Sequence, residues 1–145
     1  MSQVIIYSDD DGKCVIVIPT PEILQKNTIN DVAFVDVPEG KSYQIIEADQ
    51  VPASRTFRQA WRVNGKAITQ DMPECKNIAM AKVRAKRDEK FTDFDKRYNV
   101  AQRDNADLAA LKAERQTLKD IPQVAQLQVD AATTPEQLEE IINNV

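Results

Sequence analysis

The sequence contains no histidine among its 145 residues. Histidine is the commonest general base and the commonest metal ligand of proteins, so Ser–His and Cys–His pairs and most hydrolase designs are excluded. Only three glycines are present, Gly12, Gly40 and Gly65, and their spacing allows neither of the glycine-rich loops that bind nucleotide phosphates. We therefore expect a protein without enzymatic activity and without a cofactor.

Cysteine and long hydrophobic runs are also scarce. Cys14 and Cys75 lie far apart and neither belongs to a CxxC pair, so the sequence indicates neither a disulfide framework nor a zinc site. The longest apolar run covers residues 14–18, far short of the roughly 20 residues that cross a bilayer. We expect reduced thiols, no membrane span and no signal peptide.

Acidic residues offer one apparent metal motif. Asp9, Asp11 and Gly12 match the third, fifth and sixth positions of an EF-hand loop. The first and twelfth positions of that loop would then be Tyr7 and Ile18, which cannot bind calcium through their side chains. The sequence therefore favours a solvated turn here, and we predict no metal site.

The charge is unevenly distributed along the chain. The net charge is -4, with an apolar share of 42% and a charged share of 29%, values typical of a folded globular protein. Residues 1–103 contain 16 basic and 15 acidic side chains, a net of +1, whereas residues 104–145 contain 3 and 8, a net of -5. The acidity thus belongs to the last third, where it affects solubility and the charge of partner surfaces.

The N-terminal part shows signals of a small mixed module. Two β-branched runs, residues 4–7 and 14–18, flank an Asp- and Gly-rich turn and predict a β-hairpin. Thr20 and Thr28 each have the character of a helix N-cap, and residues 43–47 are typical of a further strand. A second hairpin is predicted around Asn64-Gly65.

Between these elements lies the segment with the strongest interaction signal. If residues 54–61 are helical, Phe57 and Trp61 share one face while Arg55 and Arg58 lie off it. Aromatic and arginine side chains are enriched in protein interfaces, which makes Arg55, Phe57, Arg58 and Trp61 candidate partner-binding residues. The only tryptophan of a small domain is also a typical core anchor, so core and docking surface both remain open.

The C-terminal part is predicted to be helical. No glycine or proline interrupts residues 74–103, which indicates one long helix whose apolar residues thin out after Val83. Asp104-Asn105 should end it, a second helix should fold back as far as Ile121, and a last short helix should begin at Thr134. We therefore predict an α+β fold, with an N-terminal α+β module at 1–70 and a helical arm at 71–145.

On the outer half of the long helix, Phe91, Phe94 and Tyr98 form a narrow apolar stripe. A lone helix would leave this stripe in water, so these three residues are further candidate partner-binding residues and could form a homo-oligomer. The alternative is that the stripe packs within the chain, against Leu108 and Leu111 of the returning helix.

A basic cluster occupies residues 82–90 of the same helix. Its five lysines and arginines suggest nucleic-acid binding as one alternative. Asp88 and Glu89 interrupt the cluster, and Asp93 and Asp95 follow it, so a solvated or partner-facing surface is favoured.

Several segments together resemble a known group of proteins. These are residues 51–61, which include RTFRQAW, then Asp71-Met72-Pro73 at the start of the long helix, and residues 113–122. The chain resembles small proteins encoded among the structural and tail genes of tailed bacteriophages, some of which are described as tail-assembly or tail-fibre-assembly chaperones. The resemblance implies no catalytic residues, other phage tail or fibre proteins as partners, and a place in the virion or, during assembly, in the host cytoplasm. We expect a virion structural protein, such as a tail, fibre-attachment or neck component, with a soluble assembly chaperone as the alternative.

Overall fold

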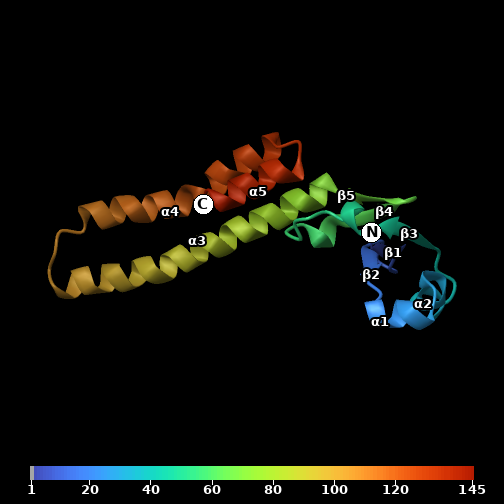
Figure 1. Cartoon of the computed structure of the whole chain (residues 1–145). Coiled ribbons are helices and arrows are strands. Elements are labelled where there is room, and N and C mark those ends of the chain that lie inside the picture. The colour runs from blue at the N-terminus through green and yellow to red at the C-terminus, as the bar shows by residue number, and fades with distance from the viewer. Residues whose placement is uncertain (1) are drawn as a thin grey trace. The chain divides into compact units, whose positions relative to one another are not determined.

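The computed structural model describes residues 2–145 and confirms the α+β fold (Figure 1). Its contacts divide the chain into two compact units, Met1–Asp71 and Met72–Val145. All strands of the described residues lie in the first unit, and the second consists of helices. The boundary falls after Asp71, compared with the expected one after residue 70.

A three-stranded antiparallel sheet forms the centre of the first unit. Its strands are β1 (Gln3–Ser8), β2 (Cys14–Val17) and β3 (Tyr43–Glu47), with β1 in the middle. The predicted hairpin of β1 and β2 is confirmed, with Ile5 paired to Val17. Its turn is held by Asp9, whose Oδ1 accepts hydrogen bonds from the backbone N–H groups of Asp11 (2.9 Å) and Lys13 (2.8 Å).

Both faces of this sheet are covered, which explains why three consecutive residues of β1 are buried. Side chains of a strand alternate between the two faces. Ile6 packs with Trp61 in one cluster, together with Val4, Cys14 and Ile46. Ile5 points to the other face and packs with Val32 and Ala33.

Two short helices, α1 (Pro21–Lys26) and α2 (Ile29–Asp36), begin at the predicted caps. The Thr20 hydroxyl accepts a hydrogen bond from Ile23 N. Thr28 and Asp31 form a reciprocal capping box, in which Asp31 Oδ2 accepts from Thr28 N at 2.9 Å and Thr28 Oγ1 accepts from Asp31 N at 3.1 Å. α2 buries Val32 and Ala33, whereas α1 buries no residue.

Residues 54–61 do not form the helix that was considered for them, so Phe57 and Trp61 do not share a helix face. The segment forms only the 3-10 helix η2 (Arg58–Ala60), and another, η1 (Ala48–Gln50), precedes it. Trp61 then begins strand β4 (Trp61–Asn64), which pairs with β5 (Ala67–Gln70) in the predicted second hairpin. Strand pairing of Trp61 with Gln70 and burial of the indole outweigh the weak local preference for a helix.

The second unit contains α3 (Met72–Arg103), α4 (Ala109–Ala131) and α5 (Pro135–Asn143). α3 ends as predicted near Asp104, and Asn105 adopts a left-handed conformation with φ of 54°. Ala106 N donates to Ala101 O (3.0 Å) and Asn105 N to Gln102 O (3.2 Å). These two bonds are the Schellman pattern of a helix C-terminus.

The predicted end of the second helix at Ile121 is wrong. α4 continues through Pro122 as far as Ala131. A proline within a helix removes one hydrogen bond and costs about 3 kcal/mol. Burial of Ala125 and Val129 beyond the proline continues the face that Leu118 begins, and this packing offsets the cost.

The three helices pack along one another, with α4 and α5 both in contact with α3 (Figure 1). Two lysines of α3 cap the neighbouring helices, since Lys76 Nζ donates to Asp130 O (3.1 Å) and Lys86 Nζ to Ile142 O (2.8 Å). Positive charge at a helix C-terminus is favourable because the last carbonyls carry partial negative charge. The N-cap of α5 is Thr134, as predicted, and its hydroxyl accepts a hydrogen bond from Gln137 N.

Candidate protein-binding surface

The aromatic residues of the RTFRQAW segment lie in the interior. Trp61 is 0% exposed and packs against Val4 and Ile6, and Phe57 is 2% exposed. Of the two interpretations left open by the sequence, the structure supports a core role for both side chains. They were predicted among the partner-binding residues, and that part of the prediction is corrected, because a partner cannot reach them in this conformation.

The arginines of the same segment lie at the surface. Arg55 and Arg58 are both exposed, and η2 positions them through the hydrogen bond from Arg58 N to Arg55 O (3.1 Å). Arg62 has a structural role instead, since its Nη1 donates to the carbonyls of Gln59 (2.9 Å) and Trp61 (3.0 Å). Arg55 and Arg58 are therefore the members of this group that a partner can contact.

The aromatic stripe of α3 lies inside the helical hairpin of α3 and α4. Phe94 is 1% exposed, its ring meets Phe91 edge-on at 6.2 Å between centroids, and it lies 5.8 Å from the ring of Tyr98. Phe91 and Tyr98 are half-buried. Packing within the chain was one of the two alternatives, and the structure supports it. The prediction that Phe94 binds a partner is corrected accordingly.

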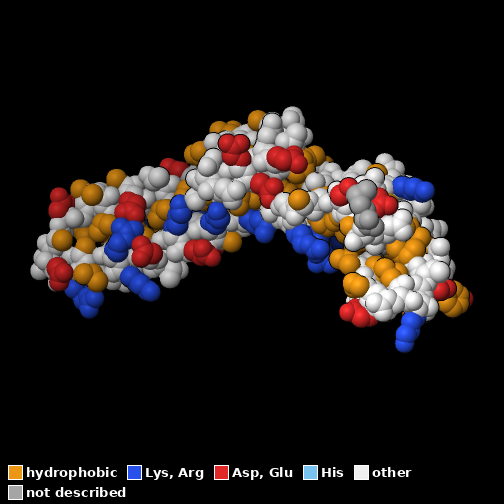
Figure 2. All heavy atoms as spheres, viewed as in Figure 1, with side chains coloured by type: hydrophobic (Ala, Val, Ile, Leu, Met, Phe, Trp, Pro, Cys, Tyr) orange, Lys and Arg blue, Asp and Glu red, His pale blue; other side chains and the backbone are white. Residues whose placement is uncertain are grey.

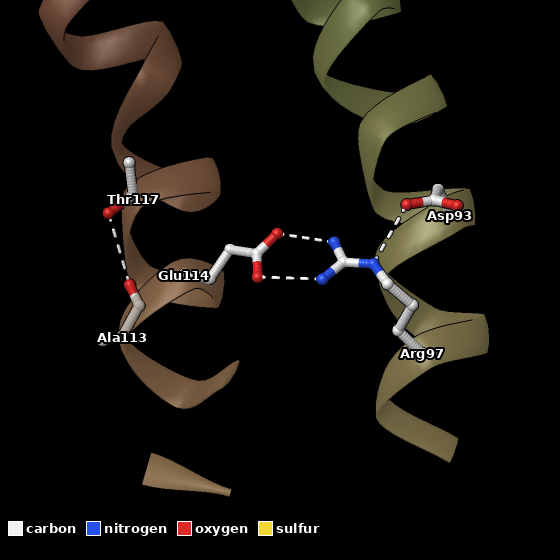
Figure 3. Close-up of polar contacts among 5 residues, drawn as sticks. All are labelled: Asp93, Arg97, Ala113, Glu114 and Thr117. Carbon is white, nitrogen blue, oxygen red and sulfur yellow. Dashed lines mark hydrogen bonds and ion pairs between the residues drawn. The ribbon is translucent and has the colours of Figure 1, made fainter. Parts of the chain in front are cut away.

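An ion pair between α3 and α4 lies beside this stripe. Arg97 donates to both carboxylate oxygens of Glu114 on α4 and to Asp93 on its own helix (Figure 3). The hydrogen bonds from Arg97 hold the pKa of Glu114 below its usual range, and the two carboxylates raise the pKa of Arg97. The Arg97 guanidinium also lies over the Phe94 ring, 5.6 Å from its centroid, where a cation–π interaction is favourable.

The basic cluster of α3 is partly used within the second unit. Lys86 donates to the carbonyl of Ile142, and Arg87 pairs with its neighbour Asp88. Within the cluster, Lys82, Arg84 and Lys90 are exposed, whereas Lys86 and Arg87 are half-buried. Three exposed cations are a small number for a surface that would neutralise several phosphates.

A surface that was not predicted from the sequence lies on α1, on α2 and at Ile18, the residue that follows β2. Phe34 is 88% exposed and Val35 is 78% exposed. Five of the eight large hydrophobic side chains that are exposed in the described chain fall within residues 18–35, and we call this set the α1–α2 surface: Ile18, Ile23, Leu24, Phe34 and Val35. Figure 2 shows hydrophobic and acidic side chains side by side in this part of the first unit.

The exposure follows from the sequence of α2. Residues 32–35 (VAFV) are all apolar, and four consecutive residues cover every side of a helix that turns once in about 3.6 residues. Val32 and Ala33 face the sheet, so Phe34 and Val35 must face away from it. An apolar run longer than one helix face was the signal that could have identified this surface.

A hollow of about 440 Å³ adjoins the exposed helix face. α2 contributes Ala33 and Phe34 to its walls, and the turn that follows contributes Pro38, Glu39 and Gly40. Tyr43 forms part of the remaining wall, and its hydroxyl donates to Asn30 Oδ1 at 2.9 Å. The hollow is therefore mainly apolar, and the charged residues of its lining are Glu39 and Lys41.

Metal-binding groups and accessible thiols are both absent from the described residues. Within residues 2–145, no group of three or more His, Cys, Asp or Glu side chains is placed to hold a metal ion. Cys14 and Cys75 are buried thiols, and burial raises the pKa of Cys14, which lowers its reactivity. No helix of this part of the chain is both long and apolar enough to span a bilayer.

Comparison with known proteins gives no relative, since no family model, no curated protein and no solved structure matches the chain.

Proposed function

We propose that this chain is a non-enzymatic structural protein of a tailed bacteriophage particle, a tail, fibre-attachment or neck component that acts by contacting other proteins. The observation that carries the proposal is the α1–α2 surface, where large apolar side chains such as Phe34 and Val35 lie in solvent. Exposed apolar side chains concentrated in one region are typical of interaction sites. The resemblance of the RTFRQAW segment to phage structural and tail proteins supports the phage assignment.

A soluble tail or tail-fibre assembly chaperone is the second candidate, because a transient partner would also need an exposed apolar surface. Nucleic-acid binding has less support, since Lys86 and Arg87 of the basic cluster already have partners within the second unit.

Quantitative mass spectrometry of purified phage particles tests the proposal. A structural component is expected at a fixed number of copies per particle. Complete absence from the particles would contradict the structural role and leave the chaperone as the function.

A matched pair of variants tests the surface itself. In phage carrying Phe34→Ser, the particles should contain less of this protein, whereas Leu127→Ser should leave its amount unchanged. Both side chains are highly exposed, at 88% and 75%, and Leu127 lies on α4 of the other unit. Because exposed side chains contribute little to stability, neither variant should unfold the chain. Normal incorporation of Phe34→Ser would exclude the α1–α2 surface as the contact.

A further inference from the structure

The negative charge of the first unit coincides with its exposed apolar side chains. Residues 1–71 contain 10 acidic and 7 basic side chains, a net charge of -3. Residues 21–40 alone contain four acidic and one basic, which is also -3. The rest of the unit, with 6 acidic and 6 basic side chains, is therefore neutral overall. The acidic residues of the segment are all exposed: Glu22, Asp31, Asp36 and Glu39.

On α2, Asp31 shares a face with the exposed apolar side chains, and Asp36 is the last residue of the helix. Asp31 precedes Phe34 by three residues and Val35 by four, and residues at these spacings are neighbours on a helix surface. The lining of the hollow beside Phe34 includes Glu39 and one lysine, Lys41, and this lysine is paired with Asp10 at 2.5 Å. The charge left at this apolar surface is thus predominantly negative.

The helix α1 gives a separate indication that something covers this region. It has only six residues and none of them is buried, although Ile23 and Leu24 are apolar. Isolated helices shorter than about 12 residues are marginal in water and depend on tertiary contacts. Ile23 is 43% and Leu24 42% exposed, so a partner that covers the exposed parts of these side chains would add to the contacts that α1 makes within its own unit.

We propose that the α1–α2 surface binds a cationic segment of a partner protein, one that places an apolar side chain in the hollow beside Phe34 and directs lysines or arginines toward Asp31, Asp36 and Glu39. This inference rests on the proposed function and adds the chemistry of the partner. A membrane with anionic lipids would be repelled by a surface of this sign. A second copy presenting the same patch would meet like charge, because a two-fold interface brings identical patches together.

The test measures binding of two synthetic peptides to the full chain by fluorescence anisotropy. The peptides have equal length and the same central leucine and phenylalanine residues, and they differ only in flanking lysines or flanking glutamates. The lysine peptide should bind, with an affinity that falls as salt rises, and the glutamate peptide should not. Absence of binding by the lysine peptide, or equal binding of both, overturns the proposed chemistry.

Two variants with matched controls assign the binding to this surface. Phe34→Ser should lower the affinity for the lysine peptide by about tenfold or more, as expected of an interface anchor. Val124→Ser on α4 should leave that affinity unchanged. Asp36→Asn combined with Glu39→Gln should weaken binding by about three- to tenfold and reduce the salt dependence. Glu89→Gln with Asp95→Asn removes the same charge from α3 and should have no effect. If Phe34→Ser binds normally, the attraction is not located at this surface and the proposal fails.

Two further measurements examine the other possible occupants. Vesicles containing phosphatidylglycerol should not bind the chain, and sedimentation should show no dimer that Phe34→Ser abolishes. Binding to the vesicles would instead identify a membrane as the occupant of the surface. A dimer that Phe34→Ser abolishes would identify a second copy of the chain. If the two peptides bind equally, mass spectrometry of the particles still tests the structural role on its own. A wrong partner chemistry can therefore be distinguished from a wrong function.

Discussion

Arg97 of α3 and Glu114 of α4 are joined by a forked ion pair, with Arg97 Nη1 3.0 Å from Glu114 Oε2 and Nη2 bound to Oε1 (Figure 3). The two residues lie 17 positions apart on antiparallel helices. A bidentate arginine–carboxylate contact accepts only a narrow range of geometries. Because both side chains are partly exposed, at 45% and 40%, the pair contributes modest stability, and its main effect is to select one register of the hairpin.

The ion pair predicts a dependence of stability on pH. Arg97 holds the pKa of Glu114 below its usual value, which is about 4.3 in an unfolded chain. The stabilisation is therefore complete above about pH 4.3 and is lost as the pH falls through the lower pKa of the folded state. Glu114→Gln should have a lower urea midpoint than wild type at pH 7, and the difference should disappear in acid. Arg115→Ala, at an exposed neighbour, should show no such convergence.

Phe94→Asp should unfold the helical hairpin. The side chain is 1% exposed between Phe91 and Tyr98, and removal of a buried phenylalanine costs about 3–5 kcal/mol even without a buried charge. Circular dichroism should show a large loss of helix, whereas Val100→Asp, at a 46% exposed position of the same helix, should keep it. A folded Phe94→Asp monomer obtained from a wild-type oligomer would instead place the stripe in an interface.

Trp61 should tolerate phenylalanine much better than alanine. The indole is 0% exposed, and its Nε1–H finds no acceptor within residues 2–145. Trp61→Ala should cost about 3–5 kcal/mol in urea unfolding. Trp61→Phe loses contacts but also removes an unpaired buried donor, which itself costs about 1–3 kcal/mol. A cost of Trp61→Phe equal to that of alanine would show that the N–H has a partner in solution.

Asn105→Gly should stabilise the second unit. Asn105 has φ of 54° at the end of α3, and glycine adopts this left-handed conformation without the steric cost of a Cβ. The expected gain is a few tenths of a kcal/mol up to about 1 kcal/mol, measured as a higher urea midpoint. Asn105→Val should lower the midpoint, because a β-branched residue is strained at positive φ. Equal midpoints for the two variants would contradict the assigned turn.

Elements governed by neighbouring residues were predictable from the sequence. The caps at Thr20, Thr28 and Thr134 and the end of α3 near Asn105 depend on hydrogen bonds within a few residues, and each was confirmed. The helix through Pro122 was not predictable, because the packing that sustains it comes from a distant part of the chain. The same reason explains the error at Phe57 and Trp61, where pairing with β5 decides the conformation.

The candidate site was less predictable than the fold. Trp61 and Phe94 were predicted as partner-binding residues because they are aromatic. The residue type alone does not distinguish an interface anchor from a core residue. Phe34 was not predicted to bind a partner, because it lies among other apolar residues of α2. Which of these faces the sheet depends on the register of α2 against β1, and that contact is non-local.

The partial cover that α5 gives to α3 divides the second unit into regions of different local stability. α5 ends near Lys86, so three helices pack together along the first part of α3, while the outer part of the hairpin consists of α3 and α4 (Figure 1). Amide hydrogens should therefore exchange slowly near Val83 and progressively faster toward Asn105, because opening the outer turns breaks fewer buried contacts. We therefore expect reversible local unfolding at the hairpin tip, while the part that α5 covers stays folded.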